Sequence, residues 1–247
     1  MTHVIVYNKS TTAKGKPEAV FSCLKKGGGP MPSSTVTVQV QHLKKLIEKA
    51  NAIEGAGKKA ISSTLKDVKS RAPGWIASEV VAVYNIKKSE ITPAGKGAKP
   101  RKMAGTLRIK GETFDELAFV YEGRRLTPVH FGMTPKAPPQ GKNYTLKMQV
   151  VKGKKTTIGR YKAKRTPGGP YSQRSHNILM GTGNMKEGGV NWIPFQRMSK
   201  NRLDLQKFLT TSVPQMVTSD LTYEAIMKKL NEETAKRLEH NINRFMK

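Results

Sequence analysis

The apolar residues at the carboxyl end of the chain recur at the spacing of one helical face. Steps of three or four residues join Tyr223, Ile226, Leu230, Leu238, Ile242 and Phe245, with Thr234 as the one polar step. Ser219 or Asp220 can cap the start, because a short side-chain oxygen accepts hydrogen bonds from the free N–H groups of a first turn. The pattern predicts an amphipathic helix over about 220–246, whose apolar face needs a partner.

Two further helical patterns lie nearer the amino end. One face of the first is formed by Leu43, Leu46, Ile47, Ala50 and Ile53, which predicts a helix over about 40–54. The second runs from Ile61 to Tyr84 and predicts a helix over about 57–85. Pro73 interrupts it and either kinks this helix or starts a new one, because proline lacks a backbone donor. We expect the two helices to form a hairpin that covers a sheet.

Short alternating runs separated by glycine and proline occupy the middle of the chain. Such runs predict strands of a mainly antiparallel sheet within about 105–197. They are Gly105–Lys110, Leu117–Tyr121, Tyr144–Val151, Thr156–Tyr161, Asn177–Gly181 and Trp192–Arg197. The segment 151–156 is typical of a hairpin tip. The predicted fold class is α+β, with the helix pair and the C-terminal helix packed on the sheet.

The first residues have a different composition. A short β-like run, Val4–Tyr7, is followed by a stretch rich in lysine, glycine and proline that ends at Pro30. Glycine loosens the chain and proline prevents ladder pairing, so we interpret residues 1–37 as an extended arm that reaches a neighbouring subunit. Residues 38–247 are expected to form a single α+β domain.

The chain carries a large excess of positive charge. Its 45 lysines and arginines face 17 acidic residues, which gives a formal net charge of +28, and no acidic residue lies between Glu122 and Glu187. Such charge attracts polyanions by releasing their counterions, or it docks against acidic neighbours. The hydrophobic fraction of 36% allows only a modest core. These features indicate a component of an assembly, with the charge concentrated on the sheet and its loops.

Residue patterns typical of chemistry are missing from the sequence. Cys23 is the only cysteine, and the five histidines are scattered, so neither forms a metal-binding motif. His130 and His176, near predicted strand ends, could converge, but ordinary hydrogen-bonded histidines are favoured. The acidic group Glu112, Asp115 and Glu116 belongs to a predicted turn. The sequence therefore predicts no catalytic residue, no cofactor and no metal.

Glycine-rich loops and apolar runs were also considered. Neither Gly27–Gly29 nor Gly95–Gly97 has the spacing of a phosphate-binding loop. No apolar run approaches the roughly 20 residues that span a bilayer, and the amino end does not resemble a signal peptide. We expect a soluble protein with no membrane partner, made in the cytoplasm.

Direct nucleic-acid binding is the alternative function. The basic tract from Lys142 to Arg174 interleaves Tyr144, Tyr161 and Tyr171, and bases can stack on aromatic rings beside cations. No helix-turn-helix, zinc-finger or RNA-binding signature accompanies the tract. The alternative is therefore a basic protein that contacts packaged DNA or RNA.

Several segments of the chain resemble the phage minor tail protein Z family. Trp192–Met198, Asn201–Leu205 and Thr211–Val217, followed by the closing helix, have the order of elements typical of this family. Asp204 stands where a proline would be usual. The paired helices and Asn85–Ile91 are similar as well, so the resemblance covers roughly 38–247.

The resemblance implies a tail completion protein and no enzyme. Such a protein forms a ring, hexameric to match tail symmetry, at the head-proximal end of the tail and takes part in head–tail joining. The implied partners are further copies, the tail terminator, and tail tube or neck proteins, with incidental contact to packaged DNA. The implied location is the tail or neck of the virion, assembled in the host bacterial cytoplasm.

Five cationic residues are candidates for contacts with subunits or DNA. Arg197 and Arg202 lie on the family-like strand and turn, where each can pair with a neighbour's carboxylate or brace the helix pair within the chain. Lys152, Lys154 and Lys155 lie at the predicted hairpin tip. They are candidates for docking on an acidic ring or facing DNA, beside the plain alternative of a solvated tip.

Overall fold

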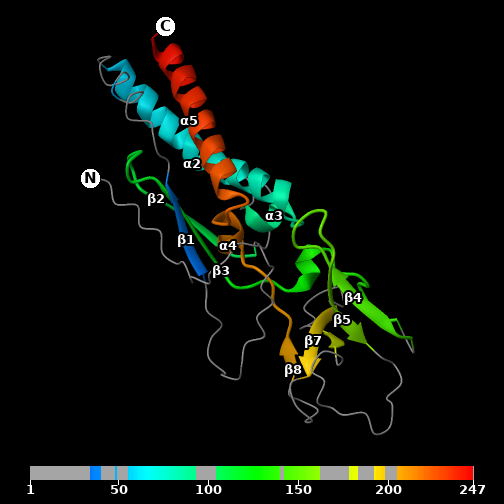
Figure 1. The fold of residues 1–247 in the computed structure, drawn as a ribbon. Coiled ribbons are helices and arrows are strands. Elements are labelled where there is room, and N and C mark those ends of the chain that lie inside the picture. The colour runs from blue at the N-terminus through cyan, green and yellow to red at the C-terminus, as the bar shows by residue number, and fades with distance from the viewer. Residues whose placement is uncertain are drawn as a thin grey trace.

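A computed structural model describes residues 34–39, 48, 55–92, 104–139, 142–161, 178–182, 192–197 and 205–246 (Figure 1). The helices are α2 (Ala56–Val83), α3 (Lys88–Ile91), the 3-10 helix η1 (Pro128–Phe131), α4 (Val213–Val217) and α5 (Tyr223–Phe245). The strands are β1 (Ser34–Gln39), β2 (Thr106–Lys110), β3 (Ala118–Gly123), β4 (Tyr144–Met148), β5 (Thr156–Tyr161), β6 (Ile178–Thr182), β7 (Trp192–Arg197) and β8 (Leu205–Lys207). The predicted α+β class is confirmed.

Helices α2 and α5 lie side by side and run in opposite directions (Figure 1). The end of α5 meets the start of α2, where the Asn241 amide donates hydrogen bonds to Thr64 Oγ1 at 3.0 Å and Asp67 Oδ2 at 3.3 Å. At the other end, Tyr84 hydrogen-bonds with Ser219. The two longest helices of the described chain therefore contact each other along much of their lengths.

The predicted apolar stripe of α5 is confirmed for most of its length. Ile226, Leu230, Thr234 and Leu238 are all fully buried. Ile242 and Phe245, predicted to continue the stripe, are only half-buried, and Asn241 takes the buried position instead. Its amide is satisfied by Thr64 and Asp67 across the helix pair, which is why a polar residue can lie there.

Pro73 lies inside α2 without dividing it. The helix is continuous from Ala56 to Val83, so the alternative of two helices is wrong. A proline inside a helix loses one hydrogen bond, at a cost of about 3 kcal/mol. Pro73 is itself buried, as are Ala72 and Ile76. The helix predicted over 40–54 lies outside the described residues, apart from Glu48, which is helical.

The strands form three small antiparallel sheets where one sheet was predicted. Their orders are β1-β3-β2, β4-β5 and β6-β7-β8. Each of the six predicted runs coincides with or overlaps a strand, whereas β1 and β8 were not predicted. Strand β1 pairs with β3, with Val36 opposite Tyr121, so the boundary drawn after residue 37 falls inside a strand of this chain's own sheet. The rest of the predicted arm, residues 1–33, lies outside the described residues.

The described chain has two hydrophobic cores, and the larger one also takes in Leu126 and Phe131 from the segment before β4. The larger core joins α2, α3, β2, β3, α4 and α5 and includes Ile76, Phe119, Tyr121 and Met216. The smaller one contains Met133, Tyr144, Leu146 and Ile178, with Phe208 packed against it. We call the described residues from Arg124 to Thr211 the β unit and the remainder the helical body. Strands β4, β5, β7 and β8 lie together beyond the carboxyl end of α2 (Figure 1).

Replacing Leu230 by alanine tests the packing of α5 on α2. Leu230 is 0% exposed, so truncation is expected to lower the free energy of unfolding by about 2–5 kcal/mol, measured by chemical denaturation. The matched control is Leu221→Ala, because Leu221 is 47% exposed and its truncation should change the stability by at most about 0.5 kcal/mol. Equal losses in the two variants would contradict the described packing.

Candidate functional site

The β4–β5 hairpin has one buried face and one exposed cationic face. On β4, Tyr144, Leu146 and Met148 are buried, whereas Lys147 between them is exposed. The register places Lys147 opposite Thr157 and Thr145 opposite Arg160. Because side chains opposite each other in an antiparallel pair share a face, these four residues lie on the outer side of the hairpin. A one-residue register shift between Leu146 and Lys147 accommodates Ile158.

A stacked pair of tyrosines stabilises the inner face of this hairpin. The Tyr144 and Tyr161 rings lie 4.7 Å apart between centroids, with an interplanar angle of 19°. Burial, and to a smaller extent the neighbouring Tyr161, raises the pKa of the Tyr144 hydroxyl, while a hydrogen bond with the Met180 backbone partly offsets this. The rings therefore pack on each other and on the smaller core. Base stacking on Tyr144, considered from the sequence, does not fit its buried position, and Tyr171 lies outside the described residues.

Strand β4 is held from both sides. Besides β5, the segment after η1 pairs with it: the Thr134 amide donates to the Lys147 carbonyl at 2.8 Å, and the Lys147 amide donates to the Thr134 carbonyl at 2.9 Å. The Gln149 amide donates to the Phe131 carbonyl at 3.0 Å. Thr134 is exposed and lies opposite Lys147, which extends the outer face by one row. The backbone beneath Lys147 is therefore fixed by hydrogen bonds on either side.

The predicted hairpin tip is confirmed, and its backbone is attached to the end of α2. The Asn85 amide donates to the Val150 carbonyl and the Lys152 amide to the Val83 carbonyl, both at 2.9 Å. A turn follows, closed by the Lys154 amide and the Val151 carbonyl at 3.1 Å; Gly153 has a φ of 82°, which suits glycine. The predicted contact residues Lys152, Lys154 and Lys155 are all exposed on this anchored turn.

The two arginines predicted to make contacts are less well defined. Arg197 is the last residue of β7, and its backbone pairs with Leu205 of β8. Its side chain and the whole of Arg202 lie outside what the structure describes. Pairing of either arginine with a neighbour's carboxylate, or with the helix pair, therefore stays a prediction.

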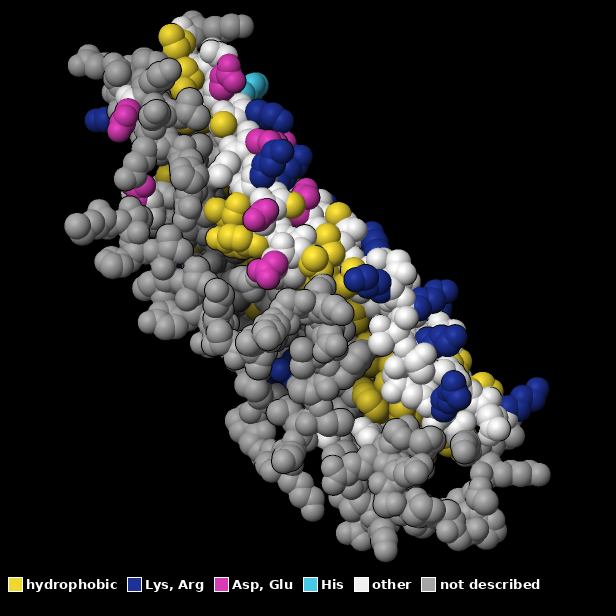
Figure 2. Space-filling view, in the orientation of Figure 1, with side chains coloured by type: hydrophobic (Ala, Val, Ile, Leu, Met, Phe, Trp, Pro, Cys, Tyr) yellow, Lys and Arg dark blue, Asp and Glu magenta, His cyan; other side chains and the backbone are white. Residues whose placement is uncertain are grey.

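Charge is distributed unevenly between the two parts of the molecule. In the described residues, every acidic side chain belongs to the helical body: Glu48, Asp67, Glu79, Glu90, Glu112, Asp115, Glu116, Glu122, Asp220, Glu224, Glu232, Glu233 and Glu239. The described residues of the β unit contain cations only: Arg124, Arg125, Lys136, Lys142, Lys147, Lys152, Lys154, Lys155, Arg160, Arg197 and Lys207. Figure 2 shows acidic side chains among basic ones over the helices, and basic ones alone at the lower right end.

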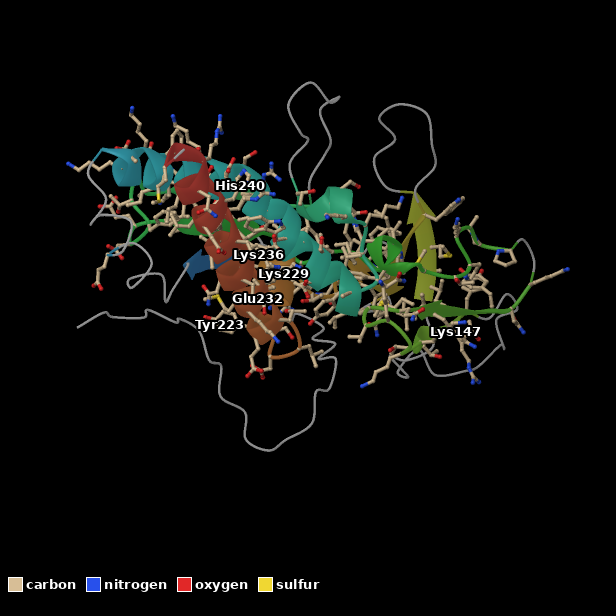
Figure 3. All side chains as sticks on the ribbon, turned by 90° about the horizontal axis from the view of Figure 1, so that it is seen from above. Lys147, Tyr223, Lys229, Glu232, Lys236 and His240 are labelled. Atoms are coloured by element: carbon tan, nitrogen blue, oxygen red, sulfur yellow. The ribbon has the colours of Figure 1, made fainter. Side chains whose placement is uncertain are left out.

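The outer face of α5 illustrates the difference. Glu233 forms ion pairs with Lys229 at 3.4 Å and Lys236 at 3.5 Å, so cations of the helical body have acidic partners within the same helix. Lys147, on β4, lies apart from the labelled Lys229 and Lys236 of α5 (Figure 3). The described β unit offers its cations no carboxylate of its own.

One histidine has a close acidic partner. His130 Nδ1 lies 2.6 Å from Glu90 Oε2, which links η1 to α3. Sequence reasoning considered His176 as a companion of His130, but His176 lies outside the described residues and Glu90 was not foreseen. The pair joins the β unit to the helical body. Glu112, Asp115 and Glu116 lie exposed in the turn between β2 and β3, as predicted.

No three histidine, cysteine or acidic side chains in the described part of the chain come close enough to hold a metal ion. No helix there is both long enough and apolar enough to cross a bilayer. Comparison with known proteins finds no matching family model, no matching curated protein and no matching solved structure.

Sequence reasoning selected the tip lysines and missed the outer face of the hairpin. That face comprises Thr134, Thr145, Lys147, Thr157 and Arg160, which we call the outer hairpin face. A signal was present, because buried and exposed residues alternate from Tyr144 to Met148 and place Lys147 outward. The contribution of Thr134 could not be predicted, because no alternating run marks the residues around Pro135.

Removing the Tyr161 ring tests whether the stacked pair stabilises the hairpin. Tyr161→Ala is expected to lose at least the roughly 0.5–1.5 kcal/mol of an aromatic pair. Backbone amides of β4 and β5 should then exchange hydrogen several-fold faster, measured by mass spectrometry. Tyr161→Phe keeps the ring and should leave the exchange rates close to those of the unaltered protein. Unchanged rates in the alanine variant would show that the stack is not needed.

Proposed function

We propose that the chain is a structural subunit of a bacteriophage tail. It acts as a tail completion protein, forms a ring with copies of itself at the head-proximal end of the tail, and takes part in head–tail joining. It works through its surfaces and carries out no catalysis. Its neighbours are the tail terminator and the tail tube or neck proteins.

The observation that carries the surface role is the uneven distribution of charge. The described β unit presents only cations, and its backbone is attached to α2 by hydrogen bonds at Val83 and Asn85. An anchored surface of one charge speeds docking on a surface of opposite charge and fixes the register of the contact. An anchored cationic surface of this kind suits a subunit that binds other proteins of an assembly.

The link to a phage tail rests on the resemblance of several segments. The first, from Trp192, contains β7, and the third, from Thr211, contains α4, which leads into α5. In α4, Ser212 and Gln215 form a reciprocal capping box, with the Ser212 amide 3.0 Å from Gln215 Oε1. Ser212 and Gln215 thus fix the start of α4, which connects the β unit to α5. Such a structural role agrees with their place in a segment that resembles the family.

A second candidate is a basic protein that binds nucleic acid outside any particle. The same cation-only β unit favours it, because lysine and arginine neutralise phosphates. The two candidates differ in where the protein is found. A tail subunit is retained in purified particles, whereas a free nucleic-acid-binding protein is absent from them.

Charge reversal at the hairpin tip tests the proposed function. The variant Lys152→Glu, Lys154→Glu, Lys155→Glu is expected to be at least about tenfold depleted from purified tail particles, because like charges repel across the contact. Quantitative mass spectrometry of the particles measures this, and native mass spectrometry of the purified chain measures the ring. The matched control reverses Lys58, Lys59 and Lys66, which are exposed on α2, and should be incorporated normally.

Two results would count against the tail assignment. The first is absence of the unaltered chain from purified particles. The second is equal incorporation of the tip variant and the α2 control, which would mean that the tip makes no contact with the particle.

A further inference from the structure

We propose that the outer hairpin face is a contact surface for the phosphate backbone of duplex DNA, independent of base sequence. The proposal concerns the face of the β4–β5 hairpin and is separate from the tip, where Lys152, Lys154 and Lys155 lie. It rests on the proposed function only for the identity of the DNA, which in a tail is the packaged genome.

The residue types on this face are those that bind phosphate. Cross-strand pairing places Lys147 between Thr134 and Thr157, and the next row pairs Thr145 with Arg160. Phosphate oxygens accept hydrogen bonds from lysine, arginine and hydroxyl groups, and such contacts make up half or more of protein–DNA hydrogen bonds. Lys147 and Arg160 lie in adjacent rows of this face, on either side of the register shift. Two cations in adjacent rows can meet neighbouring phosphates of one strand.

The described residues of the β unit contribute no carboxylate to the surroundings of this face. The described β unit contains no acidic residue, and the acidic side chains belong to the helical body (Figure 2). Lys147, on β4, lies apart from the labelled residues of α5 (Figure 3). A cationic surface without nearby carboxylates keeps its attraction for a polyanion.

Backbone rigidity supports binding to a regular ligand. Strand β4 is hydrogen-bonded to β5 on one side and to Thr134 on the other, and the hairpin connection is attached to α2. The cations therefore project from a platform whose backbone is already ordered, which lowers the entropic cost of binding.

The aromatic residues favour a duplex over a single strand. Single-strand binders use exposed rings on which successive bases stack. Here Tyr144 is only 9% exposed, and its ring stacks on that of Tyr161 on the inner side of the hairpin. The face offers cations and hydroxyl groups but no exposed aromatic ring. It is therefore suited to contacts with the phosphate backbone and not to contacts with the bases.

The test measures how salt changes the affinity for a mixed-sequence DNA duplex, by fluorescence anisotropy. In B-DNA each neutralised phosphate contributes about 0.9 to the slope of log affinity against log salt concentration. The variant Lys147→Gln, Arg160→Gln should reduce this slope by about two and weaken binding at least about tenfold near physiological salt. The matched control, Lys66→Gln, Arg71→Gln, removes one lysine and one arginine from exposed positions on α2 and should keep the original slope.

Circular dichroism and thermal unfolding check that each variant is folded. A further control, Lys147→Arg, keeps the positive charge and should retain the affinity for DNA. Equal slopes for the face variant and the α2 control would overturn the proposal. So would tighter binding to single-stranded DNA, or equal competition by polyglutamate at the same charge concentration, since the latter indicates an acidic protein partner.

The results can refute this inference and the proposed function separately. A chain that is retained in particles but shows no loss of DNA binding in the face variant would refute this inference alone. A chain absent from particles that still binds DNA through this face would refute the tail assignment alone.

Discussion

The antiparallel packing of α2 on α5 is the interaction on which the rest of the described structure depends. It buries Ile226 and Leu230 of α5 in the larger core, leaves Leu238 fully buried as well, and brings α5 back onto α2. The carboxyl end of α2 then fixes the β unit, because Val83 and Asn85 bond to the connection between β4 and β5. A helix pair thus supports a small β unit at one end. This unit has a core of its own and also contributes Leu126 and Phe131 to the larger core, and its described charged residues are all basic.

Local patterns predicted α2, α5 and six of the eight described strands, whereas long-range contacts decided what the patterns could not. The period of Ile226, Leu230 and Leu238 is a property of α5 alone, so this stripe could be predicted. The burial of Asn241 depends on Thr64 and Asp67, which lie about 175 residues earlier in the chain. The division of the strands into three sheets could not be predicted from the sequence either. An alternating pattern identifies a strand but does not say which strand it pairs with. Strand β8 has three residues, too few for a pattern.

The candidate site was predicted in part for the same reason. The lack of acidic residues between Glu122 and Glu187 pointed to a cationic region, and the tip lysines followed from the turn around Gly153. The outer hairpin face required the register of β4 with β5 and the pairing of Thr134 with Lys147, which only the folded chain defines. The pair formed by His130 and Glu90 joins residues 40 positions apart, and no motif connects them.

We propose that the β unit is the part of the protein that partners cover. Lysine reactivity towards an amine-modifying reagent, compared between the free chain and purified particles, tests it most directly. If partners cover the β unit, its lysines become several-fold less reactive in the particle; these are Lys147, Lys152, Lys154 and Lys155. The control lysines on α2, which are Lys58, Lys59 and Lys66, stay as reactive as in the free chain. Protection of the α2 lysines with unchanged reactivity in the β unit would contradict the claim.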